Sequence, residues 1–102
     1  MAQFDVYQNP NPSTRQRVPY VVDLQNDLLD GLATRVVAPL VAGASAPITG
    51  LQPVLRFEGR EWLLSTAEMA GIPTRALGAK VGSVAGERET IIAAIDLLFT
   101  GI

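Results

Sequence analysis

The residues best suited to metal chemistry lie in one polar run, DLQNDLLD at residues 23–30. Asp23, Asp27 and Asp30, together with Asn26, offer the clustered oxygen ligands that a hard cation such as Mg²⁺ prefers. No phosphate-binding loop accompanies them, and a carboxylate cluster alone is weak support for a metal site. The alternative is a solvated, turn-forming stretch after a strand. We interpret the run as scaffold and predict no metal site.

A second candidate for chemistry is the pair Glu58 and Glu61, which flanks a tight turn and resembles paired carboxylates for acid–base catalysis. Nothing else that a glycosidase or nuclease requires accompanies this pair. The chain also contains no His and no Cys. These absences remove the commonest general base, the commonest metal ligand and all thiol chemistry. Two large enzyme classes therefore become improbable, and we predict no catalytic residues and no cofactor.

The length and composition predict one small domain spanning residues 1–102. Hydrophobic residues make up 48% of the chain and charged residues 18%. This leaves ample apolar surface for a core and relatively little charge to cover the outside. The surplus favours an oligomer.

The charge pattern argues against direct binding of nucleic acid. The net charge is −2, and the 8 Lys and Arg residues are scattered rather than gathered in a stripe. The start MAQFDVYQ lacks the basic and apolar regions of a signal peptide, and no stretch approaches the ~18 apolar residues of a membrane span. We expect a cytoplasmic protein that does not enter a membrane.

Short alternating or β-branched segments predict the elements that position these residues. Glu58-Gly59 lies between two apolar runs in PVLRFEGREWLL, which is typical of a hairpin whose turn needs positive φ. Trp62, on the second arm of that hairpin, is interpreted as filling for a core or an interface. Strands are expected at 3–8, 17–24, 34–41, both hairpin arms and 74–82, with loops at 9–14, 25–34 and 42–50 and a compact connection with one helical turn at 65–73.

The final segment changes period and predicts a helix from Gly86 onward. Glu87 and Glu89 suit the positive end of its dipole. Its core stripe is expected to comprise Ile91, Ile92, Ile95, Leu98 and Phe99. At 100° per residue, Thr100 falls about 180° from Ile91, facing away from the core. Thr100 is thus free either to serve a partner or to serve nothing, as chain ends often do.

Strands followed by one terminal helix indicate a small, partly rolled antiparallel sheet with the helix packed on it. The order of MAQFDVY, YVVDLQNDLLD, TRVVAPL, EWLLSTAEMAGIP and IIAAIDLLFTGI resembles the CcdB toxins of bacterial toxin–antitoxin modules. The resemblance covers nearly the whole chain, apart from the loop at NPNPST. It implies an SH3-like barrel of antiparallel strands with a C-terminal α-helix, and a homodimer.

The resemblance also implies a function in plasmid maintenance by binding rather than turnover. Such toxins insert their C-terminal end into the A subunit of DNA gyrase and trap the cleaved DNA complex, and a CcdA-like antitoxin removes them. The family's terminal motif is Phe-Trp-Gly-Ile. Phe99, Gly101 and Ile102 match it, whereas Thr100 replaces the Trp. Thr100, Gly101 and Ile102 are therefore the expected gyrase-binding residues, with gyrase activity reduced or lost.

Arg15 and Arg17 follow the NPNPST loop and suit either an acidic peptide or a solvated surface. The family's loop in this region takes part in antitoxin recognition, and Arg17 is the matching position. One alternative is an mRNA endoribonuclease similar to MazF and Kid, which share the barrel; the absence of His and of an Arg-rich face argues against it. Another is a non-toxic homologue that only binds antitoxin.

Overall fold

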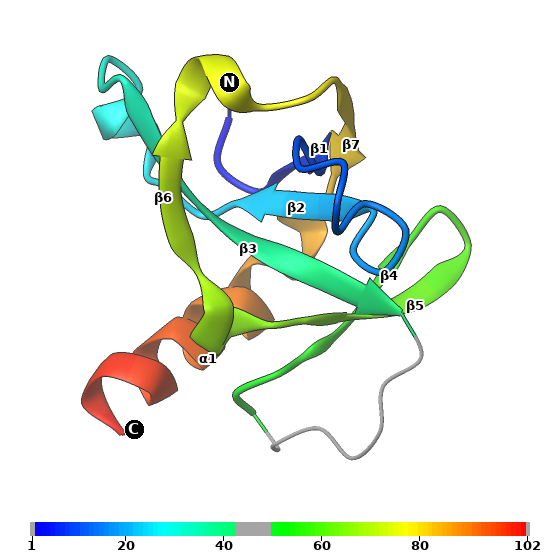
Figure 1. Cartoon of the computed structure of the whole chain (residues 1–102). Coiled ribbons are helices and arrows are strands. Elements are labelled where there is room, and N and C mark those ends of the chain that lie inside the picture. The colour runs from blue at the N-terminus through cyan, green and yellow to red at the C-terminus, as the bar shows by residue number, and fades with distance from the viewer. Residues whose placement is uncertain (1, 43–49, 102) are drawn as a thin grey trace.

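The computed structural model describes residues 2–42 and 50–101. Within them, antiparallel strands form one curled sheet, and a single α-helix follows at the C-terminal end (Figure 1). This confirms the predicted mainly β architecture, a small rolled sheet of antiparallel strands with a C-terminal helix. The elements are β1 (Asp5–Gln8), β2 (Tyr20–Asp23), β3 (Thr34–Ala42), β4 (Val54–Phe57), β5 (Arg60–Leu64), β6 (Ala70–Pro73), β7 (Lys80–Ser83) and α1 (Arg88–Thr100), with short 3₁₀ turns at Asp27–Leu29, Thr66–Glu68, Thr74–Ala76 and Ala85–Glu87.

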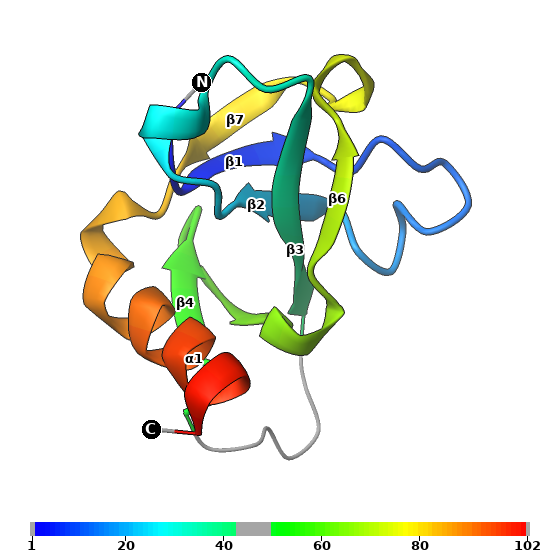
Figure 2. The same cartoon turned by 90° about the vertical axis from the view of Figure 1, so that its left-hand side faces the viewer.

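The sheet order is β4-β5-β3-β2-β1-β7, and β6 pairs separately with β3. The long strand β3 pairs with β2, with β5 through its last residues and with β6 through its first. Because one strand serves two neighbours on the same side, the sheet must bend, and Figure 2 shows it curling around the interior. The predicted connection at 65–73 was therefore partly wrong. Its helical turn exists, but β6 follows it, with Arg35 opposite Ile72 and Val37 opposite Ala70.

The hairpin between β4 and β5 is confirmed. Glu58 and Gly59 both have positive φ, at 53° and 74°, the combination that matches a tight turn to the twist of its strands. The expected strand at 74–82 begins later than predicted, after Gly78. A Cβ at Gly78 would lie 2.7 Å from the carbonyl oxygen of Gln8, so the chain passes too close to β1 for a larger residue there. The predicted loop at 42–50 falls largely outside the described residues.

The core fills the space between the curled sheet and α1. Trp62 is buried within it, donates its indole N–H to the Phe57 carbonyl at 3.1 Å and meets the Tyr20 ring edge-on at 5.3 Å. This confirms that Trp62 fills the core. The buried cluster consists of Phe4, Val6, Val22, Leu24, Ala38, Leu40, Leu55, Phe57, Trp62, Leu64, Val84 and Ile91.

The helix keeps its predicted period, but one residue of the expected core stripe was misplaced. Ile91 and Ala94, in the first half of α1, are buried, whereas the Phe99 side chain is 69% exposed. In Figure 1 the last turn of α1 lies beyond the strands, so its stripe has no sheet to pack against. No helix among residues 2–42 and 50–101 has the length and apolar character to cross a membrane.

Candidate partner-binding surface

The C-terminal end of α1 is a capped, exposed turn. Gly101 adopts the left-handed conformation, with φ 77°, and its N–H donates to the Leu97 carbonyl at 3.1 Å. Thr100 is exposed, as predicted, and its hydroxyl donates to the Asp96 carbonyl one turn earlier at 2.7 Å. The predicted site residue Ile102 lies outside the described residues. The end of the helix therefore offers a partner a Thr100 methyl group and a fixed glycine turn.

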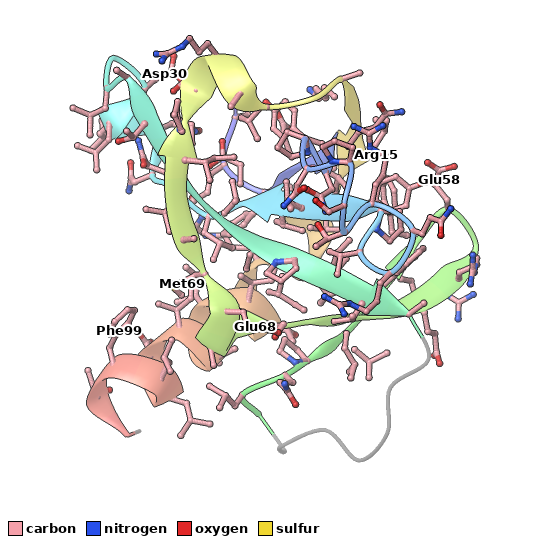
Figure 3. All side chains as sticks on the ribbon, in the orientation of Figure 1. Arg15, Asp30, Glu58, Glu68, Met69 and Phe99 are labelled. Carbon is pink, nitrogen blue, oxygen red and sulfur yellow. The ribbon has the colours of Figure 1, made fainter. Side chains whose placement is uncertain are left out.

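The Phe99 side chain, which the helical period predicted to lie in the core, instead adds an exposed apolar ring to this end of the helix. Its ring lines a groove of about 310 Å³, whose wall also includes Leu29, Met69 and Ile95. Figure 3 shows Phe99 at the end of α1 with Met69 above it, on the side of the molecule that faces the viewer in Figure 2. Leu24, Gln25, Asn26 and Val36 complete the groove.

The far wall of this groove is a 3₁₀ turn that presents leucines to solvent. Leu28 is 91% exposed, Leu29 48% and Leu32 51%. We call residues 26–33 the leucine excursion, and Leu28, Leu29, Met69, Ile95 and Phe99 the apolar face. A group of exposed large apolar side chains beside a groove is typical of an interaction site. A signal existed in the sequence, since a solvated turn has no packing use for the adjacent Leu28 and Leu29.

The acidic run 23–30 forms internal contacts. The buried carboxylate of Asp23 accepts hydrogen bonds from Arg35, whose own side chain is fully buried, and Asp30 accepts another from the same guanidinium. Asp27 accepts the backbone N–H of Gln3 at 2.6 Å. Burial alone would lower the pKa of Arg35, but its hydrogen bond and ion pair with Asp23 raise the pKa above its ordinary value, so the group stays charged. The run is scaffold, as predicted, and Arg35 is the partner that the sequence did not indicate.

Arg17, the predicted antitoxin contact, lies at a second groove. This groove measures about 350 Å³ and lies between the 9–18 loop and the sheet. Arg15 is committed to the loop, because its Nε donates to the Asn9 carbonyl at 3.1 Å. The exposed Arg17 guanidinium pairs with no side chain in the described part of the chain. The lining comprises Asn9, Asn11, Thr14, Arg17, Val18, Val21, Val37, Pro39, Glu68 and Ala70.

The two grooves lie on opposite sides of one short segment. Glu68 and Ala70 line the groove beside Arg17, whereas Met69 between them lines the groove beside Phe99. The two grooves are therefore separate sites, divided by residues 68–70.

The Glu58 and Glu61 pair does not form an acid–base site. Both residues are exposed at the hairpin, and Glu61 forms a solvent-exposed ion pair with Arg56 at 3.7 Å. General acid–base catalysis needs carboxyl groups held around a substrate, and an open turn surface does not supply that. Within residues 2–42 and 50–101, no group of acidic side chains is arranged to hold a metal ion.

Among known protein families, the model of the CcdB protein family matches residues 3–101, nearly the whole chain.

Proposed function

The chain belongs to the CcdB family, the toxins of toxin–antitoxin systems, and from this membership we propose that it acts by binding the A subunit of DNA gyrase through the end of α1. Binding at that end would trap the complex of gyrase with cleaved DNA. The function is one of recognition, without turnover of a substrate.

The observation that carries the proposal is the exposure of Phe99. Fully burying a side chain of this kind stabilises a protein by about 1.5–3 kcal/mol, so a monomer forgoes much of that energy here. The same ring adjoins Thr100, which stands at the Trp position of the family's terminal motif, and Gly101, which matches that motif. We propose the apolar face, together with Thr100, Gly101 and Ile102, as the gyrase-binding surface.

Three further proposals follow from family membership. We propose that the chain forms a homodimer, that it acts in the cytoplasm, and that a CcdA-like antitoxin neutralises it. The Arg17 guanidinium, which pairs with no side chain among the described residues, lines the groove between the 9–18 loop and the sheet. This supports a contact with an acidic antitoxin segment, since charge-assisted hydrogen bonds to Arg are strong.

Thr100 favours a second candidate, a homologue that binds antitoxin but poisons gyrase weakly or not at all. Its hydroxyl is bonded to its own helix, so the side chain offers one methyl group where the family presents a Trp ring. This candidate predicts tight antitoxin binding and a homodimer without a gyrase-cleavage complex.

The decisive experiment compares the natural chain with Phe99→Ala in three assays: binding to the purified gyrase A subunit, accumulation of cleaved DNA by gyrase, and growth under a tightly controlled promoter. We expect Phe99→Ala to weaken gyrase binding by about 30-fold or more, as for truncation of an aromatic anchor. Val54→Ala is the matched control, because Val54 is 48% exposed on β4 and does not line the groove.

Equal binding by Phe99→Ala and the natural chain would contradict the proposed surface. Cleavage of bulk mRNA by the purified chain, in the absence of gyrase, would instead support the endoribonuclease alternative. Neither activity, with antitoxin binding retained, would identify the non-toxic homologue.

A further inference from the structure

We propose that Arg35 is a positioning residue, which holds the leucine excursion in the shape against which a partner docks. The inference rests on the proposed function, because it concerns the same apolar face. It assigns a role to a buried side chain that makes no contact with the partner itself.

The Arg35 guanidinium joins the interior to the excursion. Its Nε donates to Asp23 Oδ2 at 3.0 Å and its Nη2 donates to the same oxygen, with both side chains fully buried. Its remaining nitrogen, Nη1, donates to Asp30 Oδ1 at 3.1 Å. Asp30 directly follows the exposed pair Leu28 and Leu29 and ends their 3₁₀ turn. One rigid, planar group therefore fixes the end of the turn relative to β2 and β3.

The Gln25 side chain links the leucine excursion to the sheet through further hydrogen bonds. Its side-chain Nε2 donates to the carbonyl of Leu29 and to the carbonyl of Thr34, each at 3.1 Å, and its Oε1 accepts the N–H of Val36 at 3.1 Å. The side chain is buried. Together, the side chains of Gln25 and Arg35 connect the exposed turn to β3. The Asn26 side chain caps the start of the turn by accepting the N–H of Leu28.

The arrangement is poorly explained by stability alone. A buried Arg–Asp pair contributes little net stability compared with apolar residues of similar volume. The outward bond from Arg35 ends on Asp30, whose side chain is 55% exposed, so solvent screens the Asp30 charge and weakens its attraction to the guanidinium. A fixed turn does have value for binding, because a side chain that is already ordered loses less entropy when a partner covers it. Positioning explains why the guanidinium reaches outward.

The test uses two substitutions at Asp30 that leave the interior intact. Asp30→Ala removes the acceptor of Arg35 Nη1, whereas Asp30→Asn keeps an acceptor oxygen and removes the charge. In Asp30→Ala we expect amide hydrogen exchange at Leu28, Leu29 and Leu32 to become about tenfold faster or more. The midpoint of urea unfolding should fall only slightly, because water at the exposed Asp30 position can accept the hydrogen bond of Arg35 Nη1. We expect gyrase binding to weaken about 3- to 10-fold. Asp30→Asn should behave like the natural chain in both measurements.

Two results would overturn the inference. Unchanged exchange in Asp30→Ala would show that Arg35 does not hold the turn. Equal loss of binding in both variants, with faster exchange in Asp30→Ala alone, would show that the Asp30 carboxylate contacts the partner directly and that the shape of the turn does not determine binding. The exchange measurement needs no partner, so a natural chain that fails to bind gyrase would refute the proposed function, while the comparison of the two variants would still decide the role of Arg35.

Discussion

Replacing Thr100 with Trp tests whether an aromatic side chain at this position is all that the end of α1 lacks for tight binding to gyrase. Thr100 is exposed, and its hydroxyl is held by the Asp96 carbonyl at 2.7 Å, so a partner meets a single methyl group. A Trp at this position would project from the same exposed turn beside Phe99 without displacing a core residue. We therefore expect Thr100→Trp to fold as the natural chain does.

The expected gain in binding follows from the area of the ring. An aromatic side chain buries about 150–250 Å² at an interface. At about 25 cal/mol per Å² this corresponds to roughly 4–6 kcal/mol, from which the loss of rotamer freedom and imperfect desolvation must be subtracted. A net gain of about 2–4 kcal/mol remains, as measured for aromatic anchors, and it would tighten binding roughly 30- to 1000-fold.

The assay is calorimetric titration of the gyrase A subunit with the natural chain, Thr100→Trp and Thr100→Val. The Val variant keeps the shape of Thr and replaces its hydroxyl, which is bonded within the helix, with a methyl group, so it should bind as the natural chain does. Expression from a tight promoter should show a stronger growth defect and more gyrase-cleaved DNA for the Trp variant. Strong binding by the natural chain, with no gain from the Trp, would refute the argument that a contact has been lost.

Other substitutions probe the rest of the molecule. Arg17→Ala should weaken binding of an acidic antitoxin segment about 5- to 30-fold in fluorescence titration, because a charge-assisted contact is lost, while gyrase binding changes less than about twofold. Gly82→Ala should lower the free energy of unfolding by about 1–3 kcal/mol in urea titration, since the new Cβ would lie 2.5 Å from the buried Phe57 ring. Burial, together with the nearby Asp5 and Asp23 carboxylates, raises the pKa of the Tyr7 hydroxyl. Between the pKa of the unfolded chain and that of the folded chain, only the folded chain keeps the phenolic proton. The free energy of unfolding therefore falls as the pH rises past about 10. Tyr7→Phe removes this titration, and urea titrations at pH 8 and pH 10.5 should show a smaller loss for the variant.

The sequence predicted elements whose pattern is local. The hairpin around Glu58 and Gly59 was predictable because its turn residues determine its geometry. The helix was predictable because its apolar residues repeat with a helical period. Strand β6 was not, since Ala70–Pro73 contains Gly and Pro, and pairing with β3 rather than its own pattern makes it a strand.

The site was predictable in part for the same reason. The exposure of Thr100 followed from its helical angle. The exposure of Phe99 depends on how far the sheet extends beneath α1, and the apolar period of the helix carries no information about that distance. Arg35 was missed because its partners, Asp23 and Asp30, reach it only when β2 and β3 pair.

Trp62 has an optical consequence. It is the only Trp of the chain and lies buried against Tyr20. Its emission therefore reports the interior alone, and a shift to longer wavelength marks unfolding without any label. In Thr100→Trp a second emitter stands at the exposed end of α1, and the difference between the two spectra isolates it. A partner that covers this ring should shift that difference to shorter wavelength, so the same variant that tests binding also signals it.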